Sequence, residues 1–298
     1  MRWEGNRESD NVEDRRGGPD FGGGGGGGGF GFGGRSIGIG AVVLALVGWG
    51  LFDINPLTTL GLLSGGAPPQ QHQQQRAPAR PPPANDQGAA FVSTVLASTE
   101  DVWGHVFQQA GRRYVQPRLV LYRGMTPTAC GAGQAAMGPF YCPADQKVYL
   151  DMDFFDTMNR QLGAPGVFAR AYVIAHEVGH HVQKLTGVSD RVDAQRGRVS
   201  QAQQNALSVR VELQADCYAG IWANRSQQAR HWLEQGDIES AINAASRIGD
   251  DALQRQRSGV VRPDSFTHGS SAQRVRWFTQ GYKTGNVQAC DTFSAQAL

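Results

Sequence analysis

The sequence predicts a mostly helical α+β domain in the C-terminal two thirds of the chain, preceded by segments that cannot form a core. Apolar residues recur at helical spacing through most of the stretch from residue 91 onward. Two short apolar runs, 118–122 and 147–150, have the composition of strands. More than half of the 40 glycines and 14 prolines fall before residue 91. We therefore expect one folded domain after a long, unfolded-looking leader.

The leader contains one apolar stretch. Residues 1–35 are polar, charged and Gly-rich, whereas residues 36–52 carry no charge and end before Asp53. As a helix, residues 36–52 would span roughly 25 Å, slightly less than a hydrocarbon core of ~30 Å. A buried core helix and a cleaved signal peptide are the alternatives. The flanks offer a core helix nothing to pack on, and no Ala-x-Ala cleavage site follows. We therefore predict one transmembrane helix.

The distribution of basic residues predicts the topology. No Lys or Arg follows the apolar stretch until Arg76, and five arginines precede it: Arg2, Arg7, Arg15, Arg16 and Arg35. The positive-inside rule then places residues 1–35 in the cytoplasm. Residues 53–90, rich in Pro, Gln and Gly, form a linker. The domain at 91–298 is expected on the periplasmic or extracellular side, as part of a single-pass protein of the cell (inner) membrane.

Within the domain, the first predicted helix begins near Phe91 and ends before Pro117. The two strands flank a Gly-rich loop bounded by Cys130 and Cys142. We expect the strand at 147–150 to be the sheet edge on which an extended peptide lies. Further helices are expected from about 153, at 166–185, 199–232 and 237–257, and from about 271.

Composition excludes some functions. The formal net charge of +2 and the lack of a basic patch argue against nucleic acid as a partner. The glycine run at 22–29 lies in low-complexity sequence and is not a phosphate-binding loop. The four cysteines show no Cys-x-x-Cys spacing, so a structural zinc knuckle is disfavoured. Their even number is compatible with two disulfides in an oxidising compartment.

The strongest chemical signal is the segment His176-Glu177-Val178-Gly179-His180. Histidines at i and i+4 of a helix lie on one face and can share a single ion, and neutral imidazole suits zinc. Glu177 lies beside that face, where it can reach a water held by the metal. The alternative is a pair of surface histidines on an amphipathic helix. Gly179 favours the metal site, because a mid-helix glycine costs about 1 kcal/mol and indicates a close approach by another segment.

A catalytic zinc needs a third protein ligand and an open position. The extended metzincin pattern fails, since Gln183 and Thr186 occupy the positions where it requires Gly and His. Glu212 and Asp216 stand at i and i+4 among apolar neighbours, where two carboxylates need a cation. We expect Glu212 to be the ligand and Asp216 to bond a ligand histidine through its second ring nitrogen. Two ordinary helix-surface acids are the alternative.

The Glu-x-x-x-Asp element after His-Glu-x-x-His resembles the gluzincin peptidases. More closely, the chain is similar to the bacterial family called putative neutral zinc metallopeptidases, the YpfJ-like proteins. The matching stretches cover most of the chain outside the spacers: 1–17, 138–151, 176–184, 212–223 and 268–281. The resemblance implies a zincin-like catalytic domain, one Zn²⁺ ion and a peptide or protein substrate. It does not supply the identity of that substrate.

In such an enzyme Glu177 would be the general base. His268, in a turn-like Thr-His-Gly-Ser segment, is our candidate donor to the developing oxyanion. A surface histidine is the equal alternative at this position, and Arg274 and Arg276 are weaker candidates for the donor.

For the cysteines, the natural pairing is Cys130 with Cys142 and Cys217 with Cys290. Cys217 as a zinc ligand is the competing idea, disfavoured because Cys217 lies off the face shared by Glu212 and Asp216.

The function expected from the sequence is therefore a membrane-anchored zinc peptidase. Two other classes remain open: a catalytically idle, zinc-stabilised binding module, and a scaffold of the cell envelope. Glu177 argues against the binding module, because a structural zinc site needs no general base. The sequence does not indicate an oligomeric state.

Overall fold

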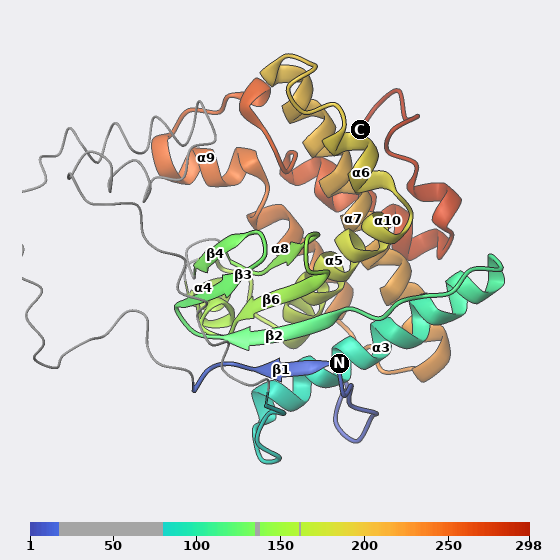
Figure 1. The fold of residues 1–298 in the computed structure, drawn as a ribbon. Helices are drawn as coiled ribbons and strands as arrows, with labels where there is room; N and C mark the ends of the chain where they lie inside the picture. Colours follow the sequence, from blue (N-terminus) through green and yellow to red (C-terminus); the bar gives the residue numbers. More distant parts are fainter. Residues whose placement is uncertain (18–79, 135–137, 161) are drawn as a thin grey trace, which may run out of the picture. The chain divides into compact units, whose positions relative to one another are not determined.

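A small mixed sheet underlies the fold (Figure 1). The computed structural model describes residues 1–17, 80–134, 138–160 and 162–298. The four strands of the sheet lie in the order β1-β2-β6-β5. Their bounds are β1 Val12–Asp14, β2 Arg118–Tyr122, β6 Lys147–Asp151 and β5 Phe140–Cys142. Strands β1, β2 and β6 run parallel, and the edge strand β5 runs antiparallel to β6.

The central strand β2 is buried on both faces. Leu119, Val120 and Leu121 are each inaccessible to solvent, as expected for a strand with parallel neighbours on both sides. The unbroken apolar run Leu119–Val120–Leu121 is the feature from which the sequence predicted this strand. A separate two-stranded hairpin joins β3 (Met125–Thr128) to β4 (Gly131–Gln134).

Helices make up most of the described chain. They are α3 (Gln87–Gln109), α4 (Phe154–Arg160), α5 (Val167–Leu185), α6 (Val188–Asp193), α7 (Gln201–Arg230), α8 (Asp237–Arg247), α9 (Asp250–Ser258) and α10 (Ser271–Thr284), with short 3₁₀ turns η2 (Pro263–Ser265) and η3 (Val287–Cys290). Ser200 and Ser270 begin α7 and α10 with complete capping boxes. The predicted mostly helical α+β class with a small sheet is confirmed.

Helix α5 lies between the sheet and the pair α7 and α10 (Figure 1). Its contact with α7 is close, since a Cβ at Gly179 would lie 3.1 Å from the Cα of Ala215. The sequence prediction that Gly179 permits such an approach is thus confirmed. This close crossing brings residues of α5 and α7 into one site.

Two details of the sequence prediction are wrong. Strand β6 lies inside the sheet, and β5 forms the edge instead. The single helix expected at 237–257 is two helices, α8 and α9, separated at Gly249. A Cβ at Gly249 would collide with the backbone of Ser271, so this glycine lets the start of α10 approach the break.

The prediction that residues 1–35 lie outside the folded domain is wrong for residues 1–17. Residues 1–17 belong to the same compact unit as residues 80–298, because β1 pairs with β2. Arg80 bridges to Asp14, so the end of the predicted linker joins this unit too. Within the described residues no helix has the length and apolar character of a membrane span. The predicted transmembrane helix at 36–52 lies outside the described residues.

Candidate metal centre

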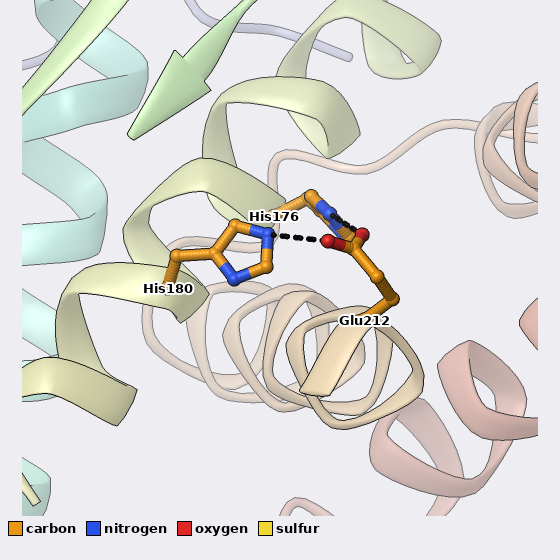
Figure 2. A group of neighbouring side chains, drawn as sticks. All are labelled: His176, His180 and Glu212. Atoms are coloured by element: carbon orange, nitrogen blue, oxygen red, sulfur yellow. Dashed lines mark hydrogen bonds and ion pairs between the residues drawn. The ribbon is translucent and has the colours of Figure 1, made fainter. Parts of the chain in front are cut away.

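Three side chains from two helices converge on one point (Figure 2). His176 and His180 project from successive turns of α5, and Glu212 faces them from α7. His176 Nε2 lies 3.2 Å from Glu212 Oε2, and His180 Nε2 lies 3.5 Å from Glu212 Oε1. The three prospective ligand atoms lie within 4.8 Å of one another. The structure therefore brings together the three residues that the sequence predicted as metal ligands.

Gln183 is hydrogen-bonded to Nδ1 of His180, the ring nitrogen that does not contact Glu212. His180 Nδ1 lies 2.9 Å from Gln183 Oε1. The amide orientation is fixed, because Gln183 Nε2 donates to Val211 O at 2.7 Å and to Gln214 Oε1 at 3.1 Å. With its oxygen turned to His180, Gln183 accepts a hydrogen bond from the Nδ1–H group and leaves Nε2 free for a metal.

Asp216 is hydrogen-bonded to Nδ1 of His176, the ring nitrogen that does not contact Glu212. His176 Nδ1 lies 2.9 Å from Asp216 Oδ1, and Asp216 is fully buried. Tyr172 donates its hydroxyl to the same oxygen at 2.5 Å. Arg274 of α10 donates to both carboxylate oxygens, through Nε at 2.9 Å and a terminal nitrogen at 2.9 Å. These hydrogen bonds fix the His176 ring with Nε2 toward Glu212.

The donor set fits zinc. Two imidazole nitrogens and one carboxylate oxygen are the ligands of many catalytic zinc sites. Each imidazole is held in the orientation that presents Nε2, as metal-binding histidines require. In the described residues this group of His, Cys, Asp and Glu side chains is the one close enough to share an ion. Three protein ligands would leave a coordination position for water or substrate.

The charge state of the site suits a cation. Burial alone would raise the pKa of Asp216, but Arg274 and His176 outweigh it and lower the pKa to about 2. Burial acts in the same direction on Glu212, and its pKa is nevertheless lowered well below the usual range by the two histidines. For His176, burial is outweighed by Asp216, and the pKa rises to about 10. A metal binding at Nε2 would therefore displace a proton.

Glu177 lies next to the histidines with only 7% of its surface exposed. Burial raises its pKa to about 7, with the nearby charge of Glu212 contributing in the same direction. Within the described residues it has no side-chain hydrogen bond in the structure, so its carboxylate is available to a water or substrate group.

His268 lies in the loop between η2 and α10. Its Nδ1 is 3.3 Å from Asp250 Oδ1, and Asp250 Oδ2 accepts the backbone N–H groups of Thr267, His268 and Gly269 at 2.7, 2.7 and 3.1 Å. The hydrogen bond with Asp250 raises the pKa of His268, and the charge of Glu212 adds to the effect. About half of the His268 side chain is exposed.

Of the two arginine alternatives to His268, Arg274 is not available to a substrate. The Arg274 guanidinium is buried and bonded to Asp216, and Arg276 is exposed and donates to the carbonyl of Leu298.

The edge strand β5 is tied to α5 by a histidine. His181, fully buried, contacts Val115 O through Nε2 at 2.6 Å and the Tyr141 hydroxyl through Nδ1 at 3.0 Å. Because a carbonyl can only accept, Nε2 carries the proton and Nδ1 accepts from Tyr141. His181 therefore positions β5 beside the helix that carries the candidate ligands.

Both predicted disulfides are present. The Cα atoms are 5.8 Å apart in Cys130–Cys142 and 5.7 Å apart in Cys217–Cys290. Cys217 is thus covalently engaged and is not a metal ligand. The second bridge links α7 to η3, near the end of the chain.

The sequence did not indicate the orienting roles of four residues: Tyr172, Gln183, Asp250 and Arg274, the last of which was considered only as an oxyanion donor. Tyr172 could have been found, since it precedes His176 by one helical turn. Gln183 stands three residues after His180, but glutamine at that spacing carries no metal-site signal. Arg274 and Asp250 meet their partners only through tertiary packing.

Comparison with known proteins agrees with this site. The family model described as "Putative neutral zinc metallopeptidase" matches residues 1–293. The uncharacterized protein YpfJ of Escherichia coli (strain K12) is 52% identical over 296 residues, covering 98% of this chain and 99% of YpfJ. The uncharacterized protein Rv2575 of Mycobacterium tuberculosis (strain H37Rv) is 45% identical over 197 residues, covering 62% of this chain and 65% of Rv2575. No solved structure matches the chain.

Proposed function

Because the chain belongs to the family described as "Putative neutral zinc metallopeptidase", we propose that it is a zinc-dependent peptidase with Glu177 as its general base. One observation carries the proposal: a buried, unbonded carboxylate lies beside a two-histidine, one-carboxylate group that could bind a metal. A purely structural zinc site would have no need of Glu177.

His176, His180 and Glu212 would hold a single zinc ion, with Asp216 and Gln183 orienting the two histidines. When bound, zinc supplies Lewis acidity, which lowers the pKa of water toward ~7 and polarises a carbonyl group. The protein residues then hold the substrate and move the proton.

Glu177 takes the proton of the attacking water and delivers it to the leaving amine. Its burial supports this role, because a carboxylate with a pKa of about 7 in the protein alone is a stronger base than an exposed one. A nearby cation would lower that pKa, which keeps Glu177 deprotonated at the start of the reaction.

His268 donates a hydrogen bond to the oxygen of the scissile carbonyl as negative charge develops there. Nδ1 contacts Asp250 and Thr267, so Nε2 is the ring nitrogen left to donate to a substrate, and the hydrogen bond with Asp250 favours the protonated ring. Its half-exposed position supports access to a bound peptide.

An extended peptide would add to the sheet along β5. This strand is the sheet edge, and Tyr141 ties it to α5 through His181. Main-chain hydrogen bonds to an edge strand would position a peptide regardless of much of its sequence.

The domain acts outside the cytoplasm. The two disulfides support this placement, because such bonds persist mainly in oxidising compartments. Attachment to the cell membrane through residues 36–52 completes the proposal and rests on their apolar composition.

Cleavage of a mixed peptide library by the full-length protein tests this function, with zinc content measured in the same samples. Glu177→Gln should keep about one zinc per chain and lose activity by about 10²- to 10⁴-fold. Glu239→Gln, an exposed change on α8, should retain both zinc and activity. If wild type and Glu177→Gln both bind zinc and neither cleaves a peptide, the protein is a zinc-stabilised binding module and the peptidase proposal fails.

A further inference from the structure

Strand β1 enters the sheet from the start of the chain. It pairs in parallel with β2, with Val12, Glu13 and Asp14 opposite Leu119, Val120 and Leu121. The backbone bonds Leu119 N to Asn11 O at 2.9 Å and Arg15 N to Leu121 O at 2.8 Å continue the ladder. Residues 11–15 are therefore part of the domain's own sheet.

A buried carboxylate on α3 holds the segment just before β1. Glu100 has 3% of its surface exposed. Its partners all come from residues 7–11: the Ser9 hydroxyl at 2.6 Å, the Asn11 side-chain amide at 2.8 Å and the Arg7 guanidinium at 3.0 Å. A buried carboxylate without partners is strongly unfavourable. Glu100 thus makes α3 complementary to this segment in particular.

The chain returns to the same place after residue 79. Asp14 N donates to Arg80 O at 2.8 Å, and the Arg16 guanidinium pairs with Asp86 at 2.6 Å. Asp86 is also the residue that caps α3. Residues 14–16 and 80–86 are consequently neighbours in one compact unit.

The arginines of the first segment have partners in this unit. Arg7 pairs with Glu100 and Asp101, Arg15 with Glu13, and Arg16 with Asp14 and Asp86. Arg2 donates to the carbonyl of His231. These contacts explain four of the five arginines that preceded the apolar stretch by their role in the fold. Because these four arginines have a structural role, their position before residues 36–52 is weaker support for a cytoplasmic N-terminus.

We infer that residues 1–17 lie on the same side of any membrane as residues 80–298. Paired strands lie about 4.8 Å apart, whereas a hydrocarbon core is ~30 Å thick. A single crossing by residues 36–52 would place β1 and β2 on opposite sides of the membrane. The two strands could then not pair as they do in the structure. Any crossing between residues 17 and 80 must be matched by a return. Together with the disulfides, this places residues 1–17 outside the cytoplasm as well.

Cross-linking of the full-length protein in intact cells tests the inference without reference to zinc or activity. Two double-cysteine variants replace hydrogen-bonded pairs: the exposed pair Arg7→Cys with Asp101→Cys, and the partly buried pair Asn6→Cys with Arg230→Cys. A recognition site for a sequence-specific protease is inserted between residues 64 and 78. The cells receive a short, membrane-permeant bismaleimide before lysis and protease treatment.

The N-terminal fragment is expected to stay joined to the rest of the chain in both double variants. The single variants Arg7→Cys and Asn6→Cys should release it, since the four native cysteines are paired with each other. Release from both double variants in cells, whether or not the pairs cross-link after detergent extraction, would overturn the inference. The two pairs share no residue, so a substitution that disturbs folding in one variant leaves the other as a test.

Discussion

At the scale of single residues, the candidate site depends on the hydrogen bonds made by the Nδ1 atoms of its two histidines. Gln183 fixes His180, and a cluster of Asp216, Tyr172 and Arg274 fixes His176. The sequence indicated Asp216 because a buried carboxylate at helical spacing from Glu212 needs a partner. It could not indicate Arg274, which lies 58 residues further along the chain and meets Asp216 only where α10 packs on α7.

Arg274→Gln should lower zinc affinity about 10- to 100-fold, because Asp216 would lose the donors that hold it against His176. Competition with a chromogenic chelator measures the affinity. Arg276→Gln, an exposed change on the same helix, is the matched control and should have no effect.

The same loss should be absent in an Asp216→Asn background if Arg274 acts through Asp216. Equal losses in both backgrounds would show that Arg274 influences zinc by another route, such as general packing of α10.

Asp250→Asn should shift the alkaline limb of the kcat/KM profile to lower pH. Asp250 raises the pKa of His268, so His268 stays protonated, and able to donate, to higher pH in the wild type. Loss of the carboxylate lowers that pKa, and activity then falls earlier as pH rises. His268→Ala should lower kcat about 10²-fold and remove this limb. An unchanged profile in Asp250→Asn would exclude His268 as the titrating donor.

At the scale of elements, the site is built by helices that cross unusually closely. A Cβ at Gly281 of α10 would fall on the carbonyl oxygen of Cys217 in α7, and a Cβ at Gly220 would fall on that of Phe278. The sequence revealed the α5 crossing through Gly179 because the metal motif singled that glycine out. Gly220 and Gly281 lie outside the ligand motifs themselves, and their contacts with α10 and α7 arise only from tertiary packing.

Gly281→Ala should destabilise the fold by about 1–3 kcal/mol, because the added methyl group forces α10 away from α7. Urea unfolding measures the change. Gly104→Ala on α3 is the matched control: a Cβ there meets nothing within 4 Å, so it should stabilise by up to about 1 kcal/mol. Equal behaviour of the two variants would contradict the close crossing.

Strand β1 contributes an acid-sensitive contact to the sheet. Burial would raise the pKa of Glu13, but hydrogen bonds from Lys147 and Arg15 outweigh it and lower the pKa from 4.5 to about 2. A carboxyl with a depressed pKa in the folded state stabilises the fold above its unfolded pKa. That stabilisation is lost as pH falls from about 4.5 toward 2.

Glu13→Gln should therefore cost more at neutral pH than in acid. The difference in unfolding free energy between wild type and variant should be about 1 kcal/mol smaller near pH 3.5 than at pH 7. Denaturant titrations at the two pH values measure it. The same difference at both pH values would show that Glu13 is not held by charged partners in solution.

At the scale of the whole molecule, the sequence predicted the fold class, the order of the main helices and the residues at the candidate metal centre. Those features are local: helical spacing, apolar runs and the motif at 176–180. Strand β1 was missed because three residues, Val-Glu-Asp, show no apolar alternation, and their partner strand lies more than one hundred residues away. Once β1 is included, residues 1–17 belong to the domain, and the expected separation of tail and domain by one membrane crossing no longer follows.

We propose that His176, His180 and Glu212 bind one catalytic zinc ion. Zinc-edge X-ray absorption of the protein loaded with one equivalent of zinc tests it most directly. We predict nitrogen and oxygen neighbours only, at about 2.0–2.2 Å, with scattering from two imidazole rings that persists in Glu177→Gln. A sulfur shell near about 2.3 Å, or a spectrum with fewer than two imidazoles, would contradict the claim.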